Sequence, residues 1–375
     1  MIYKKIKNYI IPPSEIYNNY VSQKRNGRII VFYKKLLKEN SLIINNREHG
    51  MLYRRIESKF IKISECNQYW DLDLYKKQET KVFNRTNLCN DKFCANCRKV
   101  KQSLRFEKFK PLLMEHSENL YHLVLTVPNC YGDNLKLTIK KMFNSFMYLT
   151  RYLKGSKKIK GLDFESLGYK GALRSLEVTT NNNMYHPHLH IGIVLEGEFN
   201  LEKTNINKFS FSNKNNKVTK FSDFEIIIQK IWYLLNTNKR VTLNNINSLA
   251  YDDIYSCKLD KFEEDDYSEL FKYIMKDQDL DKNLLTYENF KVYYYELTSV
   301  RQIQGYGCFY GLKDNDEDIF NIAEEEFERI VNELRNNECP IGIHEKPLWT
   351  LKSNTFVVSK KIVRKYLLKE LEKEE

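Results

Sequence analysis

Short apolar runs bounded by turn-forming residues predict three strands in the middle of the chain. They are YHLVLTVPN (residues 121–129), ALRSLEVTT (172–180) and HLHIGIVLE (188–196). Runs of this length between Pro, Asn or Gly residues are typical of strands. Only the Asn-rich NNNMYHP separates the second run from the third, so these two are predicted to form an antiparallel hairpin. A fourth strand is predicted in YDDIYSCKL, further along the chain.

Apolar residues at helical spacing predict four helices around these strands. Their sequences are RKVKQSLRFEKFKPLLMEH, LTIKKMFNSFMYLTRYL, FSDFEIIIQKIWYLL and DDYSELFKYIMKDQDL. Apolar residues that recur every three to four positions give a helix one face to bury. The last of the four begins with acidic residues, which interact favourably with the positive end of the helix dipole.

The two ends of the chain give weaker patterns. Residues 1–60 are poorly periodic, and the Pro12-Pro13 pair is expected to break any early helix. After about residue 312 the chain turns acidic and ends in VVSKKIVRKYLLKELEKEE, which is predicted to be a helical tail. Three regions are therefore predicted: a basic N-terminal region (1–110), a central domain (111–312) and an acidic, helical tail (313–375).

The composition is that of an ordered, globular chain with a basic N-terminal third. Hydrophobic residues make up 42% of the 375 residues and charged residues 29%, which excludes a disordered or fibrous chain. The net charge is +12, and residues 1–110 hold 25 Lys and Arg against 10 Asp and Glu, a balance of +15. Basic residues mixed with aromatic ones indicate a polyanion partner such as nucleic acid, or else a solvated basic surface.

No apolar run has the length of a signal peptide or of a membrane span of about 20 residues. The protein is therefore expected to be cytoplasmic, without a membrane partner. In that reducing compartment, its eight cysteines are expected to be free thiols or metal ligands rather than disulfides.

Three of the seven histidines lie within five residues, in MYHPHLHIGIVLEG. Alternate residues of a strand share a face, so His188 and His190 are predicted to point to one side while the apolar residues between them point into a core. Across the predicted hairpin, Glu177 offers a carboxylate. Packed or solvated histidines are the common outcome for an isolated His-x-His, but this combination favours a partly open site for Mg²⁺ or Mn²⁺.

A second candidate feature is the pair of Glu269 and Tyr273 in SELFKYIMKDQDL. Residues four apart lie on one face of a helix, with Lys276 next along that face. A phenol is a weak nucleophile at neutral pH, but a nearby metal ion and Lys276 could stabilise its ionised form and permit a covalent phosphotyrosine. Since the chain has 26 tyrosines, this motif alone is weak, and a packed tyrosine is the alternative.

Four cysteines precede the first predicted strand. Cys89, Cys94 and Cys97 lie close together, with Cys66 upstream. Four thiolates in a tetrahedral site usually hold structural Zn²⁺, so a zinc site is predicted, with unligated thiols as the alternative. Basic residues that follow directly would place a phosphate-contacting helix beside this site; they are Arg98, Lys99, Lys101 and Arg105.

Taken in chain order, YHLVLTVPN, LRSLEVTTNNNMYHPHLHIGIVLE and SELFKYIMKDQDL resemble the three motifs of the HUH endonuclease superfamily. The resemblance is greatest to replication initiator (Rep) proteins of rolling-circle plasmids. FCANCRKVKQSLRF and SVRQIQGYGCFYGL also fit that family, and the resemblance spans roughly residues 60–312. It implies an α+β fold with a central antiparallel sheet flanked by helices, the histidines on a middle strand and the tyrosine on a helix beside it.

The resemblance also implies an activity. In such initiators the residues matching His188 and His190 bind a divalent ion, and the tyrosine matching Tyr273 nicks one strand of origin DNA, single-stranded or in an extruded hairpin. A 5′-phosphotyrosyl link and a free 3′-hydroxyl primer result, and host helicase and polymerase are the implied partners. Glu269 matches a single-tyrosine branch, in which this glutamate activates water to end the cycle.

Two other functions fit part of these observations. A single-strand transposase would share the histidines and the tyrosine, but such proteins are typically shorter and lack the cysteine segment. A non-catalytic, zinc-stabilised DNA-binding regulator would need only the basic region and a degenerate nuclease fold. The complete set of His188, His190, Tyr273 and Glu269 argues against degeneracy.

Overall fold

The structure, a computed structural model, describes most of the first 312 residues and four short strands beyond them. The described residues are 13–42, 47–66, 69–75, 80–86, 88–181, 183–212, 218–250, 254–271, 285–312, 344–345, 348–350, 355–357 and 362–363. Contacts divide the chain into two compact units, one of residues 1–104 and 315–375 and the other of residues 105–314. Each unit is described separately.

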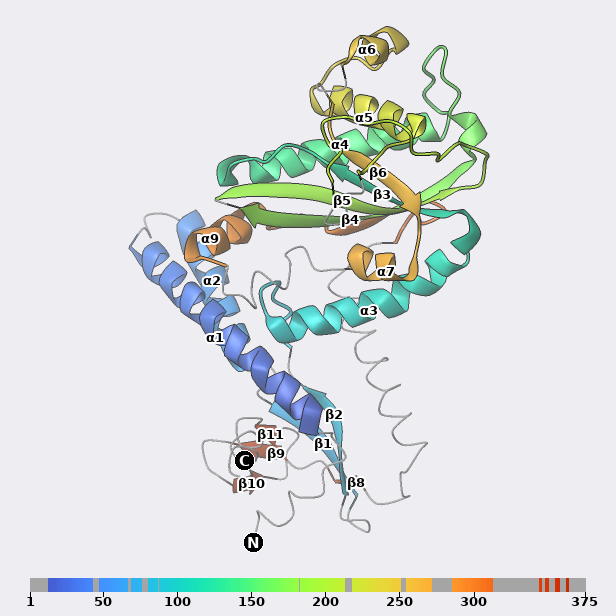
Figure 1. Ribbon diagram of the computed structural model, residues 1–375. Coiled ribbons are helices and arrows are strands. Elements are labelled where there is room, and N and C mark those ends of the chain that lie inside the picture. Colours follow the sequence, from blue (N-terminus) through green and yellow to red (C-terminus); the bar gives the residue numbers. More distant parts are fainter. Residues whose placement is uncertain are drawn as a thin grey trace. The chain divides into compact units, whose positions relative to one another are not determined.

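A five-stranded antiparallel sheet forms the centre of the 105–314 unit (Figure 1). The strand order is β6-β3-β5-β4-β7, and every neighbouring pair is antiparallel. The strands are β3 (Leu120–Thr126), β4 (Tyr169–Asn181), β5 (Met184–Leu195), β6 (Cys257–Lys261) and β7 (Ile303–Gly307). The predicted α+β class, with a central antiparallel sheet flanked by helices, is confirmed.

The predicted hairpin is formed by the two longest strands of this sheet. β4 and β5 pair from Tyr169 opposite Leu195 to Asn181 opposite Met184. The connection is therefore much shorter than the loop expected from NNNMYHP, most of which belongs to β5. Asn183 at the turn has a φ of 62°, a left-handed conformation that Asn adopts more readily than most residues.

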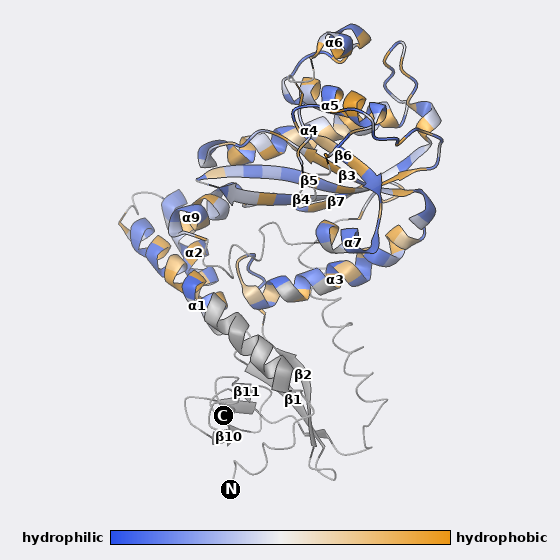
Figure 2. Ribbon diagram, in the orientation of Figure 1, coloured by the Kyte–Doolittle hydropathy of each residue, from blue (hydrophilic) through white to orange (hydrophobic). Residues whose placement is uncertain are grey.

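One face of the sheet is covered by α4 (Leu135–Leu153) and α5 (Asp223–Asn236), both at predicted positions (Figure 1). α4 buries Ile139, Met142 and Phe146 at helical spacing, and both helices carry hydrophobic and hydrophilic residues, as Figure 2 shows. α5 begins with a capping box at Ser222, which satisfies backbone N–H groups at the helix start. The short helix α6 (Leu243–Ser248) follows α5.

The other face of the sheet is covered by α7 (Glu264–Phe271) and by the part of α3 (Ala95–Met114) that belongs to this unit. Side chains from these helices and from the strands form one buried apolar cluster. Its members are Phe109, Leu113, Leu120, Leu173, Val194, Tyr267, Leu270, Phe271, Ile303 and Phe309. Val194 follows His188 and His190 at alternate positions of β5, so α7 packs on the face that carries the histidines.

A further helix among the described residues of this unit, α9 (Tyr287–Glu296), was not predicted. It packs near the turn end of the hairpin, where the Tyr185 hydroxyl donates to Asn289 at 2.8 Å. Tyr293 meets Tyr185 edge-to-face, at 5.3 Å between ring centroids. The helix thereby fixes the end of the hairpin from which the histidines follow.

In the other unit, the N-terminal region is more regular than its sequence indicated. α1 (Pro13–Ser41) and α2 (Arg47–Glu65) are long helices, and β1 (Tyr69–Tyr75) pairs with β2 (Thr80–Thr86). The proline pair lies at the start of α1, since Pro13 is its first residue, where a fixed φ and a missing N–H are tolerated. The residues before Pro13 lie outside the described residues, so the expectation that the pair breaks an earlier helix stays a prediction.

The predicted helical tail is not found among the described residues beyond 312. These residues form β8 (His344–Glu345), β9 (Leu348–Thr350), β10 (Thr355–Val357) and β11 (Ile362–Val363). β8 and β11 pair with β1, and β10 pairs with β9. Val357 of β10 and Ile362 and Val363 of β11 are β-branched residues, a type that suits strands better than helices. The acidic stretch before them lies outside the described residues.

Candidate metal centre and cysteine cluster

Glu177, His188 and His190 converge on one face of the central sheet. Glu177 lies directly opposite His188 in the β4–β5 ladder, and its Oε2 is 2.6 Å from His188 Nε2 and 3.1 Å from His190 Nε2. One potential ligand atom from each residue lies within 4.8 Å of the others. The structure therefore brings together the three residues that the sequence singled out, and all three are buried.

The electrostatics of this group favour an ionised Glu177 carboxylate beside a neutral His190 imidazole. Burial alone would raise the pKa of Glu177, but hydrogen bonds to His188 and His190 hold that pKa well below its ordinary range. Burial lowers the pKa of His190, the hydrogen bond with Glu177 opposes this, and the neighbouring His188 and His122 add to the lowering. Neutral imidazole and ionised carboxylate are the forms that ligate metal ions.

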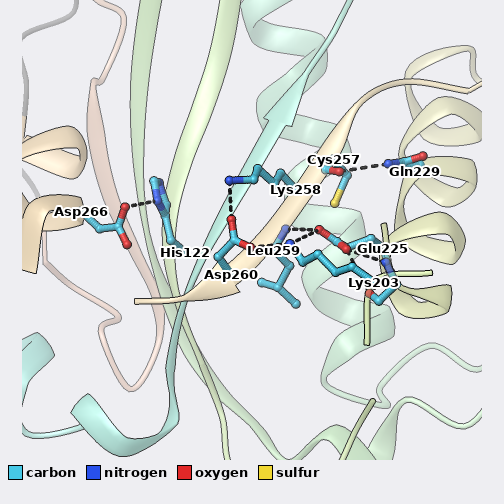
Figure 3. A network of polar contacts seen from close by, with 10 residues as sticks. His122, Lys203, Glu225, Gln229, Cys257, Lys258, Leu259, Asp260 and Asp266 are labelled. Carbon is cyan, nitrogen blue, oxygen red and sulfur yellow. Dashed lines mark hydrogen bonds and ion pairs between the residues drawn. The ribbon is translucent and has the colours of Figure 1, made fainter. Parts of the chain in front are cut away.

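Sequence reasoning missed a third histidine, His122, on β3. Its Nε2 is 3.1 Å from His190 Nδ1. Its Nδ1 is 2.7 Å from Oδ1 of Asp266 on α7, and Figure 3 shows this second contact. The signal in the sequence was one polar residue inside the apolar strand YHLVLTVPN. Burial alone would raise the pKa of Asp266, but the bonds to His122 and to the Glu263 N–H hold it below its ordinary range.

The donor set fits a divalent cation. Two imidazole nitrogens and one carboxylate oxygen can ligate such an ion from one side, which leaves further positions for water or substrate oxygens. The position of His186 differs from that of its neighbours, because His186 hydrogen-bonds to Asn129 and does not belong to the group.

Cys66, Cys89, Cys94 and Cys97 form a second group of potential ligands, in the other unit. Their sulfur atoms are 3.7 Å apart for Cys66 and Cys97, 3.5 Å for Cys89 and Cys97 and 3.4 Å for Cys94 and Cys66. Tetrahedral zinc with Zn–S bonds of about 2.3 Å needs sulfur atoms about 3.8 Å apart. The cluster therefore has nearly the dimensions of a four-thiolate zinc site.

Polar groups from the helices of this unit hold the cysteine turn. Asn26 of α1 donates to Cys94 Sγ at 3.2 Å and accepts from the Ala95 N–H at 2.8 Å. Asp91 accepts from the Tyr33 hydroxyl at 2.7 Å and pairs with Lys59 of α2 at 3.3 Å. α1 and α2 thus organise the turn that carries three of the four cysteines.

Comparison with known proteins places this chain in a family. A profile of the family described as "Replication protein" matches residues 80–344. The chain belongs to the replication protein family. The predicted resemblance to plasmid replication initiators is confirmed at this level, while the single-tyrosine branch stays a prediction.

Three relatives named "Protein rep" have low but significant similarity to this replication protein. The protein of Staphylococcus aureus is 28% identical over 39% of this chain and 62% of its own length. That of Lentilactobacillus hilgardii is 25% identical over 52% and 64%, and that of Lactiplantibacillus plantarum 23% identical over 65% and 73%. The chain thus covers less than two thirds of the first two relatives. No solved structure matches significantly.

The structure places the predicted catalytic residues of this replication protein only in part. Glu269 lies half-buried on α7, beside the members of the apolar cluster. Tyr273 and Lys276 lie outside the described residues, two and five positions beyond the end of α7. Their roles stay predictions.

The basic residues after the cysteines are less exposed than expected for a DNA-contacting helix. Arg98, Lys101 and Arg105 are at most 7% exposed, and the side chain of Lys99 lies outside the described residues. Their contact with DNA stays a prediction. In the part of the chain that the structure describes, no helix is both long and apolar enough to cross a membrane.

Proposed function

We propose that this protein initiates rolling-circle replication of a plasmid as a metal-dependent, site-specific DNA nickase and strand transferase. The observation that carries the proposal is the convergence of Glu177, His188 and His190 on the sheet face that α7 covers. Tyr273, the proposed nucleophile, lies two positions beyond the end of α7 in the sequence.

Glu177, His188 and His190 would hold Mg²⁺ or Mn²⁺. Such an ion, when bound, neutralises charge on the oxygens of the phosphate that is attacked. The burial of the three side chains favours this role, because a cation there is held by protein groups rather than by bulk water.

Tyr273 would act as nucleophile. Its phenolate oxygen attacks the phosphorus of the scissile phosphodiester, the bond from phosphorus to the 3′ oxygen breaks, and the 3′ oxygen takes up a proton. The products are a 5′-phosphotyrosyl link and a 3′-hydroxyl that primes leading-strand synthesis. Lys276 would stabilise the ionised phenol.

Glu269 would end the cycle as a general base. Its carboxylate takes a proton from water, the resulting hydroxide attacks the phosphorus of the phosphotyrosyl link, and Tyr273 leaves. This role rests on the position of Glu269 four residues before Tyr273 in the sequence.

The cysteine cluster would hold structural Zn²⁺, for which the sulfur separations of 3.4 to 3.7 Å are the support. The basic N-terminal third, including Arg98, Lys99, Lys101 and Arg105, would contact origin DNA. Host helicase and polymerase would then use the nicked strand, in the cytoplasm.

The experiment is incubation of the purified full-length protein with Mn²⁺ and labelled single-stranded oligonucleotides tiled across its own replicon. We expect one oligonucleotide to be nicked. The 5′ phosphate of its downstream fragment should be linked to Tyr273, as mapped by mass spectrometry. Chelator, His188→Ala and Tyr273→Phe should each abolish the adduct, and Tyr310→Phe, at an exposed tyrosine, should retain it.

Three outcomes would contradict parts of the proposal. Adduct formation by Tyr273→Phe at the wild-type rate would remove this tyrosine from the reaction. Tight DNA binding without any nick, whichever metal is added, would favour the non-catalytic regulator. Glu269→Ala should still nick but accumulate the adduct, and release at the wild-type rate would exclude Glu269 as the base.

A further inference from the structure

A series of polar contacts runs from α7 through His122 to His190. His190 has its Nε2 beside Glu177, so its Nδ1 is turned away from the candidate metal position and toward His122. An imidazole that ligates through Nε2 carries a proton on Nδ1, and it needs an acceptor for that proton. His122 Nε2, 3.1 Å away, is placed to be this acceptor.

These proton positions on the imidazoles are also consistent with the contact between His122 and Asp266 on α7. If His122 accepts at Nε2, its own proton is on Nδ1, which lies 2.7 Å from the Asp266 carboxylate. A carboxylate is a strong acceptor for this N–H, and its charge favours the tautomer with the proton on Nδ1. Each N–H donor in the series of contacts from His190 to Asp266 therefore has one acceptor.

Asp266 is itself fixed by the start of α7. Its second oxygen, Oδ2, accepts from the backbone N–H of Glu263 at 2.8 Å, three residues earlier. This contact is one half of a capping box, in which a side chain in the first turn satisfies a free N–H at the helix start. The Asp266 carboxylate therefore binds the first turn of α7 with one oxygen and His122 with the other.

We infer that His122 and Asp266 are positioning residues that orient His190 for the metal ion and tie the first turn of α7 to the metal centre. The inference rests on the proposed metal site and extends it to the helix that leads to Tyr273. Metal binding at Glu177, His188 and His190 and the docking of α7 would then stabilise each other, because both need the same orientation of His122.

The alternative is that His122 and Asp266 only add a packed polar pair. His122 is 8% exposed and its ring also contacts Phe262, so the loss of its side chain would reduce packing as well. Metal affinity separates the two roles, because packing alone does not decide how well a ligand is oriented.

The matched control is Asp260→Asn. Asp260 lies opposite His122 on β6, but it pairs with Lys203 and Lys258 rather than with the histidines (Figure 3).

The test measures Mn²⁺ binding to the full-length protein without DNA, from the electron paramagnetic resonance signal of free Mn²⁺. Thermal unfolding of each variant confirms that it is folded. His122→Gln and Asp266→Asn should each weaken Mn²⁺ binding by about 10- to 100-fold, the usual effect of removing a partner of a metal ligand. Asp260→Asn should stay within about twofold of the wild type.

The double variant sharpens the result. If Asp266 acts through His122, the combination of His122→Gln with Asp266→Asn should weaken binding no more than the stronger single variant does. Hydrogen exchange should also show that saturating Mn²⁺ slows exchange of the α7 amides in the wild type but not in Asp266→Asn.

Failure of the inference and failure of the metal site are distinguishable. Wild-type Mn²⁺ affinity in both Glu177→Ala and His188→Ala would refute the metal site itself. Loss of binding in those two variants, with affinity within twofold of wild type in His122→Gln and Asp266→Asn, would leave the metal site intact and overturn the positioning role.

Discussion

Glu177 on β4 and His188 on β5 are direct cross-strand partners, with 2.6 Å between Oε2 and Nε2. A one-residue shift in the pairing of the two strands would turn one of these side chains to the opposite face. The apolar residues that alternate with them pack on the other side of the sheet and prevent that shift. The hydrophobic pattern of the hairpin thus fixes the polar group as well as the core.

Glu177 should contribute strongly to metal affinity. We expect Glu177→Gln to weaken Mn²⁺ binding by about 100-fold or more, because it removes the only anion of the group. Loss of a residue that merely hydrogen-bonds to a metal ligand already lowers metal affinity by about 10- to 100-fold. The measurement is calorimetric titration with Mn²⁺. His186→Asn is the control, because His186 lies two residues from His188 but outside the group, and equal weakening in both variants would contradict the assignment.

The cysteine cluster should bind zinc and stabilise the fold around it. We expect Cys94→Ser to lose bound zinc and to lower the unfolding temperature, since metal binding free energy contributes directly to folding. Cys308→Ser, at an exposed cysteine of the other unit, should keep both. Zinc content by mass spectrometry and thermal unfolding check this, and zinc retained by Cys94→Ser with wild-type stability would exclude a four-thiolate site.

The sequence predicted the metal group because period-two alternation in β4 and β5 assigns each side chain to a face. It did not single out His122, since one histidine in an apolar strand has no characteristic spacing. The partner, Asp266, is 144 residues away in sequence, so their contact depends on tertiary packing of α7 on the sheet. Contacts of that range leave no local pattern in the chain.

The N-terminal helices show a different limit of sequence reasoning. Ile29, Tyr33 and Leu36 of α1 are buried and recur at helical spacing, but basic and polar residues around them obscured the pattern. Their burial is favoured by α2, which cannot be inferred from α1 alone. Local propensity was also insufficient to predict the short strands β8 and β11, because both pair with β1, which is distant in sequence.

Glu225 of α5 should be essential for the stability of the sheet. It is fully buried, accepts from the backbone N–H groups of Ser222 and Leu259 at 2.7 Å each, and pairs with Lys203 at 3.3 Å (Figure 3). Glu225→Ala leaves the two buried backbone N–H groups without this acceptor, while Lys203 keeps Asp260 as its partner, so we expect a loss of about 3–5 kcal/mol in unfolding free energy.

Chemical denaturation of the metal-free protein measures this loss. Glu198→Ala is the control, since the same substitution at an exposed glutamate should change the unfolding free energy by about 0.5 kcal/mol or less. Equal effects of the two variants would show that Glu225 has no special part in joining α5 to β6.

Gly305 of β7 should tolerate no side chain. A Cβ at this position would lie 1.8 Å from the carbonyl oxygen of Phe309, a backbone atom in the turn that follows the strand. We expect Gly305→Ala to destabilise the protein by about 1–3 kcal/mol or more, because the turn must move. Gly192→Ala, in the same sheet, meets no atom closer than 3.4 Å and should cost less than about 1 kcal/mol. The opposite order in thermal unfolding would contradict the close approach.

Asp260 should stabilise the protein at neutral pH and lose this effect in acid. Burial alone would raise the pKa of Asp260, but hydrogen bonds from Lys203 and Lys258 lower it below the ordinary value of 3.8. A carboxylate with a lowered pKa in the folded state stabilises the fold above its unfolded pKa, and this contribution is lost as the pH falls through the folded pKa. Asp260→Asn should therefore be less stable than the wild type at pH 6, and the difference should shrink below about pH 4.

Urea unfolding at pH 6 and pH 2.5 measures both stability differences. Glu198→Gln is the control for the loss of one exposed carboxylate. A difference that stays constant between the two pH values would mean that the lysines stabilise the fold independently of the charge on Asp260.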